Sequence, residues 1–282
     1  MKEEAGRRAD DYGTREVEAA RRVMTELAQI LGTYREAFVL VGGWVPDLLM
    51  PNAEERHVGS LDVDLLLNPE KLRAGQYAAL LELLEGRGYS QTDKAFKYAK
   101  EVELAGGPPV RVEVDFLIPE GAKADKLESR PDFRAIDLEA GWMALNASEM
   151  HDYDGTTLEG GPNRVTLAVV RIEAFVVLKA FALDARAKEK DAYDLVYSLT
   201  NWPGESAAVA ERIRPYLEDA MVQKALGILD KKFRSAEDYG PQCVAMFLDS
   251  GDPDERAFHA QDAFQRVDRL LKALGIARSP SP

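Results

Sequence analysis

The stretch Ser60-Leu61-Asp62-Val63-Asp64-Leu65-Leu66-Leu67 places two aspartates two residues apart in an otherwise apolar run. A short apolar run predicts a buried strand, and side chains alternate along a strand, so both carboxylates are expected on one face. Burying two like charges side by side is costly unless a cation neutralises them, and a hard divalent ion suits oxygen ligands. The stretch therefore predicts a metal-binding strand, although the same spacing also fits the solvent face of an edge strand.

A second stretch, Val112-Glu113-Val114-Asp115-Phe116-Leu117-Ile118, repeats this arrangement. Glu113 and Asp115 share one face of the predicted strand, and the other face is apolar. If this strand lies beside the first one, a third carboxylate joins the site. Two magnesium ions about 4 Å apart can then activate an attacking oxygen and stabilise a departing pyrophosphate. Glu113 also fits as a solvated or salt-bridged neighbour of that site.

Paired glycines follow an apolar run earlier in the chain. Phe38-Val39-Leu40-Val41 predicts a buried strand that ends in a tight turn at Gly42-Gly43, before a short helix over 44–50. Backbone amides at such a turn can approach phosphate oxygens closely. Gly42 and Gly43 are therefore candidates for binding a triphosphate, although paired glycines are also common in turns without that role.

Two helices and a hairpin are also expected in the first part of the chain. Helical spacing of apolar residues predicts a helix capped by Thr14 and continuing to about Leu31, and a second helix over 68–86. Strands over 95–104 and 110–118 flank the turn sequence Ala-Gly-Gly-Pro-Pro and predict an antiparallel hairpin.

The pattern becomes helical from Arg171 to the carboxyl end, after short strands expected near 134–138 and 164–168. The sequence thus predicts an α+β fold, with a mixed sheet and flanking helices over 1–168 and a helical domain over 169–282. No motif singles out a role for the part after Trp202.

Composition limits the classes of protein that the chain can represent. Its 282 residues are 46% hydrophobic, with one cysteine and a formal net charge of −13. That charge disfavours a protein that coats nucleic acid non-specifically, and a single cysteine closes no intramolecular disulfide. No apolar stretch reaches the roughly 20 residues of a membrane span, and the amino terminus lacks a signal-peptide core. We expect a cytoplasmic protein that does not bind membranes.

Gly42-Gly43, Asp62-Val63-Asp64 and Glu113-Val114-Asp115, in this order and strand context, resemble the signature of the DNA polymerase β nucleotidyltransferase superfamily. The resemblance implies a nucleotidyltransferase-type catalytic domain over 1–168. It further implies that the glycine turn binds a triphosphate and that Asp62 and Asp64 bind two magnesium ions. The third acid in this pattern is Asp115. One departure is the spacing, because residues 44–61 separate the glycines from Asp62, which is longer than the minimal form.

This longer spacing, with His57-Val58-Gly59-Ser60 before the aspartates, is more similar to the AbiEii-type branch, which includes toxins of toxin–antitoxin pairs. In that branch a helical-domain pattern of basic residues is followed by Lys/Arg-Asp-x-x-Asp-Leu. The matching residues here are Lys179, Arg186, Lys190, Asp191 and Asp194. The resemblance spans about residues 36–200 and implies that Ser60 and the three basic residues bind nucleotide, with His57 and the two aspartates in support.

The spacing of these basic residues adds a physical argument. Lys179, Arg186 and Lys190 are seven and four residues apart, so they lie near one face if the helix is continuous, and there they could meet the β- and γ-phosphates. The alternative is that they are surface cations paired with Asp191 and Asp194. A histidine in a loop, as at His57, is often incidental.

The combined pattern leads to one expected reaction and several expected partners. A nucleoside monophosphate would move from a nucleoside triphosphate to an acceptor hydroxyl, with two Mg²⁺ ions, or Mn²⁺ in their place, held by Asp62, Asp64 and Asp115. The resemblance suggests RNA, especially a tRNA 3′ end, as acceptor, and a cognate antitoxin as a protein partner. A cationic, aminoglycoside-like small molecule would suit the acidic chain instead, and a non-catalytic regulatory module of the same fold is a third reading. Base preference, acceptor and oligomeric state stay open.

The basic residues expected to form a groove for tRNA are distributed along the sequence. They are Arg111, Arg164, Arg171, Lys179, Arg186, Lys188 and Lys190.

Overall fold

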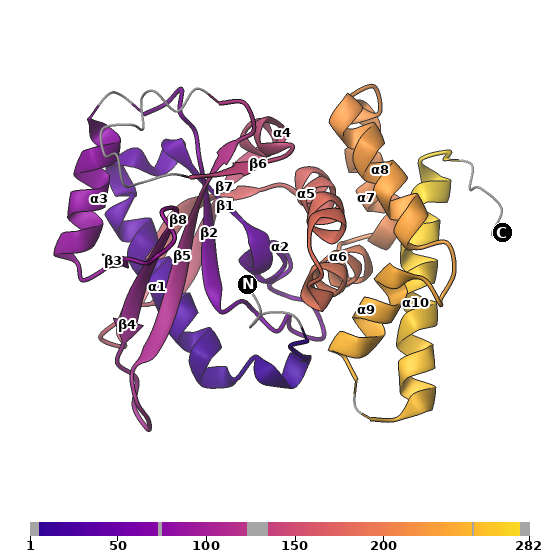
Figure 1. Cartoon of the computed structure of the whole chain (residues 1–282), viewed down its shortest axis with the longest axis horizontal. Coiled ribbons are helices and arrows are strands. Elements are labelled where there is room, and N and C mark those ends of the chain that lie inside the picture. Colours follow the sequence, from indigo (N-terminus) through magenta and orange to yellow (C-terminus); the bar gives the residue numbers. More distant parts are fainter. Residues whose placement is uncertain (1–5, 73–74, 123–134, 250, 277–282) are drawn as a thin grey trace. The chain divides into compact units, whose positions relative to one another are not determined.

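The chain forms two compact units in the computed structural model (Figure 1). The structure describes residues 6–72, 75–122, 135–249 and 251–276. The sheet unit consists of Tyr12–Leu48 and Gly59–Arg171, and the helical unit consists of Met1–Asp11, Leu49–Val58 and Ile172–Pro282. The last division follows Arg171, whereas the sequence placed the boundary after residue 168. Two earlier segments, which the prediction assigned to the sheet part, belong to the helical unit.

The sheet unit contains one mixed sheet. Its strands are β1 (Phe38–Val41), β2 (Asp62–Leu67), β3 (Ser90–Gln91), β4 (Lys97–Val102), β5 (Val110–Pro119), β6 (Ile136–Leu138), β7 (Ser148–Thr156) and β8 (Pro162–Val170). The order is β3-β4-β5-β2-β1-β8-β7, and β6 pairs with β5. Strand β2 runs parallel to β5 and antiparallel to β1, and β4 and β5 form the predicted antiparallel hairpin. The expected mixed sheet with flanking helices is confirmed.

The helices of the sheet unit are α1 (Thr14–Ile30), α2 (Val45–Leu49), α3 (Gln76–Gly86) and α4 (Gly141–Asn146). Two expected boundaries were wrong. Gly13, not Thr14, occupies the cap position of α1. Helix α3 begins at Gln76 rather than near residue 68, because Gly75 has a φ of +83° and precedes the first helical turn. Residue 134, in one of the expected strands, lies outside the described residues.

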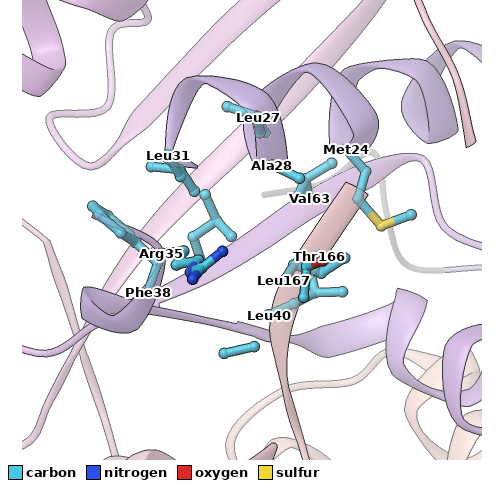
Figure 2. A pocket seen from close by; sticks show the side chains of 12 residues that line it. Met24, Leu27, Ala28, Leu31, Arg35, Phe38, Leu40, Val63, Thr166 and Leu167 are labelled. Carbon is cyan, nitrogen blue, oxygen red and sulfur yellow. The ribbon is translucent and has the colours of Figure 1, made fainter. Parts of the chain in front are cut away.

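Helix α1 packs on the face of the sheet that carries the apolar side chains of β2. Val63 and Leu65 are buried and contribute to a small cavity beneath the helix, together with Leu40 of β1 (Figure 2). Its other lining residues are Met24, Leu27, Ala28, Leu31, Arg35, Phe38, Thr166, Leu167 and Ala168. The cavity volume of about 20 Å³ is room for about one water molecule, so it is a packing defect of the core and no nucleotide site.

The helical unit is built from six helices in the described part of the chain after Arg171. They are α5 (Ile172–Ala185), α6 (Glu189–Asn201), α7 (Glu205–Ile213), α8 (Ala220–Lys232), α9 (Tyr239–Phe247) and α10 (Pro253–Ala273). Helix α5 is buried along most of its length, as expected for the central helix of a small bundle. Among the described residues no helix is both long enough and apolar enough to cross a bilayer.

Candidate active site

The three predicted metal-binding aspartates lie on neighbouring parallel strands of the sheet unit. Asp64 of β2 is the register partner of Asp115 of β5, and Asp62 is the partner of Glu113. Since residues two apart on a strand share a face, the register places all four carboxylates on one face of the sheet. We call this surface, formed by Asp62, Asp64, Glu113 and Asp115, the acidic face. The opposite face of β2 carries Val63 and is covered by the core. The structure therefore brings the acids together, as the sequence predicts.

The glycine turn directly contacts one of these acids. Val41 at the end of β1 is the register partner of Asp64, and Gly42 follows with a φ of +75°. A Cβ atom at Gly42 would lie 1.8 Å from Oδ2 of Asp64. Only glycine fits there, because any side chain would collide with the carboxylate and adopt an unfavourable backbone conformation. The turn and the acidic pair thus form a single structural site.

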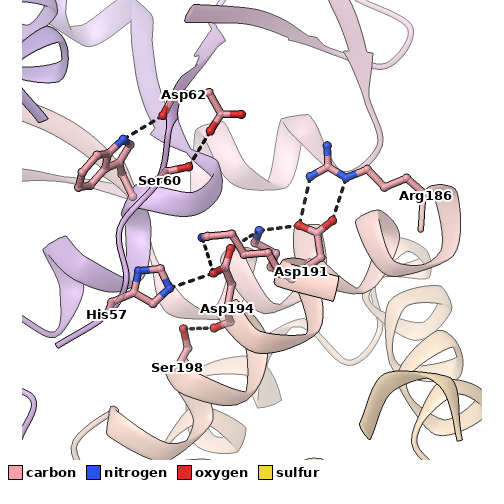
Figure 3. Close-up of polar contacts among 10 residues, drawn as sticks. His57, Ser60, Asp62, Arg186, Asp191, Asp194 and Ser198 are labelled. Atoms are coloured by element: carbon pink, nitrogen blue, oxygen red, sulfur yellow. Dashed lines mark hydrogen bonds and ion pairs between the residues drawn. The ribbon is translucent and has the colours of Figure 1, made fainter. Parts of the chain in front are cut away.

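Asp62 is held by its neighbours at both its side chain and its backbone. The Ser60 hydroxyl donates to Oδ1 of Asp62 at 2.6 Å, and the indole N–H of Trp44 donates to the Asp62 carbonyl at 2.9 Å (Figure 3). Trp44 is completely buried and follows Gly43 in the turn. These bonds fix the start of β2 relative to the glycine turn.

Lys97 of β4 is a site residue that sequence reasoning missed. Its ammonium lies 2.5 Å from Oε2 of Glu113 and 3.0 Å from Oδ1 of Asp115, and the side chain is buried. Burial alone would lower the pKa of Lys97, but the two carboxylates outweigh it and raise this pKa above its ordinary value. Lys97 is therefore a fixed positive charge at the acidic face. Glu113 has the salt-bridged role that the sequence left open.

Asp115 keeps a raised pKa although the ammonium of Lys97 lies 3.0 Å away. Burial raises its pKa to about 6 against the lowering effect of Lys97, and the charges of Asp62 and Glu113 raise it further. Although Lys97 approaches Oδ1 of Asp115, the direction is unsuitable for a hydrogen bond, and within the described residues this buried oxygen has no hydrogen-bond donor. An acidic oxygen in that situation fits a metal ligand.

The acidic face is nevertheless not assembled as a ready metal cage. In the described part of the chain no group of three or more His, Cys, Asp or Glu side chains is gathered closely enough to hold a metal ion. Two of the acids have other polar partners, because Asp62 accepts from Ser60 and Asp115 pairs with Lys97. The shared face, the unsatisfied oxygen and the glycine contact fit a divalent ion, and binding it would require these side chains to turn toward it.

A second polar cluster lies within the helical unit (Figure 3). The Lys179 ammonium of α5 donates to Asp191 and Asp194 of α6, each at 2.7 Å. Arg186 donates to both oxygens of Asp191 at 2.8 and 3.1 Å, and Lys190 donates to Asp194 at 2.7 Å. The predicted pairing with the two aspartates is present. Lys179 and Lys190 are buried, however, so these two cations are not part of an exposed groove for RNA.

These basic residues also do not share one continuous helix. Helix α5 ends at Ala185 and α6 begins at Glu189, so Arg186 lies in the connection. The condition for a single basic stripe, one continuous helix, is therefore not met. Lys179 of α5 instead contacts two carboxylates of α6. Arg186 differs from the two lysines because its side chain is 53% exposed. It is the one of the three that solvent or a ligand reaches readily.

The electrostatics of this helical cluster favour its charged form. Burial alone would raise the pKa values of Asp191 and Asp194, but the neighbouring cations, Lys179 first, hold both well below their ordinary value. The same contacts raise the pKa of Lys179 although burial opposes this, whereas for Lys190 burial prevails and lowers the pKa. Two carboxylates thus face three basic side chains.

His57 is a buried member of the helical cluster. Its Nε2 lies 2.9 Å from Oδ1 of Asp194, and its ring stacks on Tyr193 at 5.2 Å and meets Tyr197 edge-on at 4.8 Å. The same loop is tied down by the Tyr197 hydroxyl, which donates to the Glu55 carbonyl at 2.7 Å. His57 therefore supports Asp194 from within the unit. His57 is therefore not an incidental loop residue.

Comparison with known proteins gives a family match and several distant structural similarities. A crystal structure of an antigenic nucleotidyltransferase-like protein from Paracoccidioides brasiliensis is 17% identical, covering 76% of this chain and 88% of that chain at a TM-score of 0.44. A tRNA-processing enzyme complex (complex 3) is 15% identical, covering 90% and 74% at a TM-score of 0.23. An apo form of a tRNA-processing enzyme is 17% identical, covering 93% and 78% at 0.21. No curated protein matches the chain.

The family match spans well over half of the chain. The model described as nucleotidyl transferase AbiEii toxin, type IV toxin–antitoxin system, matches residues 27–271. The match covers most of both the sheet-forming and the helical parts of the sequence, including every acidic and basic residue discussed above. The chain belongs to the AbiEii nucleotidyl transferase toxin family, and it is a nucleotidyltransferase.

Proposed function

We propose that this protein transfers a nucleoside monophosphate from a nucleoside triphosphate to a hydroxyl group of RNA, in a reaction that requires Mg²⁺. The observation that carries the proposal is the register of Asp64 with Asp115, directly beside Gly42. It joins the two features that such a reaction needs, which are carboxylates on one face and a close-fitting glycine turn. Family membership supports the reaction class.

Each residue of the acidic face has a proposed task. Asp62, Asp64 and Asp115 hold the divalent ions, which would supply charge stabilisation for the phosphates and the departing pyrophosphate. Gly42 and Gly43 allow the backbone to approach the triphosphate, and the Ser60 hydroxyl either keeps Asp62 in place or donates to the nucleotide. Asp115 orients the acceptor hydroxyl through its buried oxygen, which has no hydrogen-bond donor among the described residues.

Nucleotide binding by Lys179, Arg186 and Lys190 stays a prediction from the family pattern. Their contacts with Asp191 and Asp194 compensate most of their charge, and only Arg186 is substantially exposed. We propose that Arg186 makes the direct contact with an anionic ligand, while Lys179 holds α5 against α6 and Lys190 neutralises Asp194 within α6. His57, Asp191 and Asp194 then act as supports.

The proposed acceptor is RNA, specifically the 3′ end of tRNA. The resemblance to the AbiEii-type branch suggests this acceptor, and the terminal hydroxyl of tRNA is a suitable nucleophile. A cationic small molecule is the second candidate, because the chain has a net charge of −13. Two exposed cations of the sheet unit lie beside acids, Arg164 with Asp152 at 3.1 Å and Arg111 with Glu101 at 3.8 Å. An RNA would therefore have to displace acidic neighbours.

The experiment that tests this function compares Asp64→Asn with wild type. Each is incubated with one labelled NTP at a time, with Mg²⁺, Mn²⁺ or chelator, and with either total tRNA or an aminoglycoside mixture. We expect metal-dependent label on tRNA with wild type, and a loss of at least a hundredfold with Asp64→Asn, because the acidic pair is broken. Label on the aminoglycosides instead would identify the second candidate.

A matched control is Asp152→Asn, which removes an aspartate from β7 of the same sheet at an exposed position. It should keep wild-type activity. Transfer that persists in Asp64→Asn, or that is unaffected by chelator, would contradict the proposed mechanism. Since the family is a toxin of a two-component system, the same assay with the cognate antitoxin added tests whether that partner blocks the transfer.

A further inference from the structure

One cation is built into the acidic face of the sheet unit. The Lys97 side chain is buried, and its ammonium lies 2.5 Å from Glu113 and 3.0 Å from Asp115. Strand β4 positions it, because Lys97 is the register partner of Asp115 across the antiparallel β4–β5 pair. The ammonium therefore lies where a divalent ion bound by Asp115 would also place positive charge.

We propose that Lys97 is a positioning residue that acts as an internal counter-ion, so that a divalent ion arriving at the acidic face competes with its ammonium for Asp115. Glu113 is the anchor that retains Lys97 when Asp115 turns away. The inference rests on the proposed metal-dependent function and adds a role for a residue outside the predicted signature. In the metal-free protein, Lys97 prevents the facing carboxylates from repelling one another.

The charges support competition rather than assistance. Lys97 is a lysine cation that lies between two carboxylates, 2.5 Å from Glu113 and 3.0 Å from Asp115. A divalent ion within about 5 Å of an ammonium is repelled strongly enough to change its affinity on the order of tenfold, even at the dielectric constant of water. Oδ1 of Asp115 keeps no hydrogen bond to Lys97, so the contact can be exchanged for a metal bond without breaking a directed interaction.

The test measures binding of Mn²⁺ alone, without nucleotide, to the full chain. Lys97→Met should bind Mn²⁺ about tenfold more tightly than wild type, whereas Lys97→Arg, which keeps the charge, should stay close to wild type. A purely structural lysine would change the thermal stability and leave the affinity for Mn²⁺ unchanged. Unchanged or weaker binding by Lys97→Met would therefore overturn the proposal.

Lys100 provides a matched control on the same strand. Its ammonium pairs with Glu26 at 2.7 Å, and its register partner is Val112, three residues from Asp115, which places it on the opposite face of the sheet. Lys100→Met should lose stability to a similar extent and keep the wild-type affinity for Mn²⁺.

A measurement on the wild-type protein decides the matter if Lys97→Met does not fold. In protein labelled with ¹³C at lysine Cε, titration with Mg²⁺ should shift the Lys97 signal, assigned with Lys97→Arg, and should leave Lys100 unchanged. A Lys97 signal that does not move while Mg²⁺ binds would overturn the role of Lys97 alone. Wild-type protein that binds neither ion would overturn the metal site itself, and with it the proposed function.

Discussion

At the scale of single residues, the acidic face depends on a position that has no side chain. Gly42 combines a positive φ with a location where a Cβ would overlap the Asp64 carboxylate. Alanine at this position must either displace Asp64 or move the end of β1 away from β2. Both responses disturb the contact on which the proposed chemistry rests.

We expect Gly42→Ala to reduce nucleotidyl transfer by about a hundredfold, since a displacement of about 1 Å at a catalytic group can have that effect. Steady-state transfer rates measure it, with thermal unfolding as a check on the fold. Gly32→Ala is the control, because nothing lies within 4 Å of a Cβ there and it should behave as wild type. Full activity in Gly42→Ala would mean that Asp64 does not need its present position.

Residue-scale prediction from the sequence succeeded where local periodicity decides the outcome. The spacing of Asp62 and Asp64 fixes a common face whatever the partner strand is. Lys97 could not be found in this way, because its meeting with Asp115 depends on the register between β4 and β5, which is a long-range property. The paired role of Glu113 was open for the same reason.

At the scale of elements, α5 and α6 are joined by buried charges rather than by apolar contacts alone. Lys179 of α5 donates to two carboxylates of α6, those of Asp191 and Asp194. His57, in the segment 49–58, contacts Asp194 as well. Breaking a buried pair leaves an uncompensated charge, which typically costs about 3–5 kcal/mol. The cluster therefore stabilises the helical unit only while every member keeps its partner.

Acid should weaken the helical unit through this cluster. Lys179, Lys190 and His57 hold the pKa of Asp194 well below its ordinary value of about 4 against the effect of burial. A carboxyl whose folded pKa is lowered stabilises the fold above its unfolded pKa, and this stabilisation is lost as the pH falls below about 4. Urea unfolding at pH 6 and pH 3.5 measures the difference.

Asp194→Asn removes the titrating group from the same experiment. This variant should be less stable than wild type at pH 6 by about 3 kcal/mol and should show a smaller loss between the two pH values. If wild type and Asp194→Asn lost equal stability on acidification, other carboxyl groups would be responsible.

Element boundaries show a corresponding limit of sequence reasoning. Strand β7, an edge strand with acidic and exposed residues such as Glu149 and Asp152, was not predicted because it lacks apolar alternation. The break between α5 and α6 at Arg186 contains neither glycine nor proline, so the helical pattern continues through it. By contrast, β1, β2 and β5 have dense apolar runs and were located correctly.

At the scale of the whole molecule, the chain passes repeatedly between its two units. Segment Leu49–Val58 belongs to the helical unit, although it lies in the sequence between the glycine turn and β2. This accounts for the long spacing before Asp62 that sets the chain apart from the minimal signature. The extra residues are packed, as the bonds of Glu55 and His57 within the helical unit show.

A chain that ends at Arg171 should therefore be a poor substitute for the sheet unit. In that fragment, segment 49–58 would lose its contacts with Asp194 and Tyr197. The comparison fragment begins at Tyr12, ends at Arg171 and carries a Gly-Ser linker in place of 49–58. We expect the fragment with the native segment to melt at a lower temperature and to aggregate more than the comparison fragment. Thermal unfolding and gel filtration of both fragments measure this. Equal behaviour would show that the segment is indifferent to its helical partners.

The detour of residues 49–58 has a consequence for how such a gene can be divided. Splitting the reading frame after codon 171 would translate residues 49–58 apart from the helices that contact them, and the carboxyl-terminal product would lack His57, the partner of Asp194. A single division of the gene therefore cannot give two fragments that each contain a complete unit. Recombination that exchanges the helical unit for that of a distant homologue would have to replace residues 49–58 together with the helices.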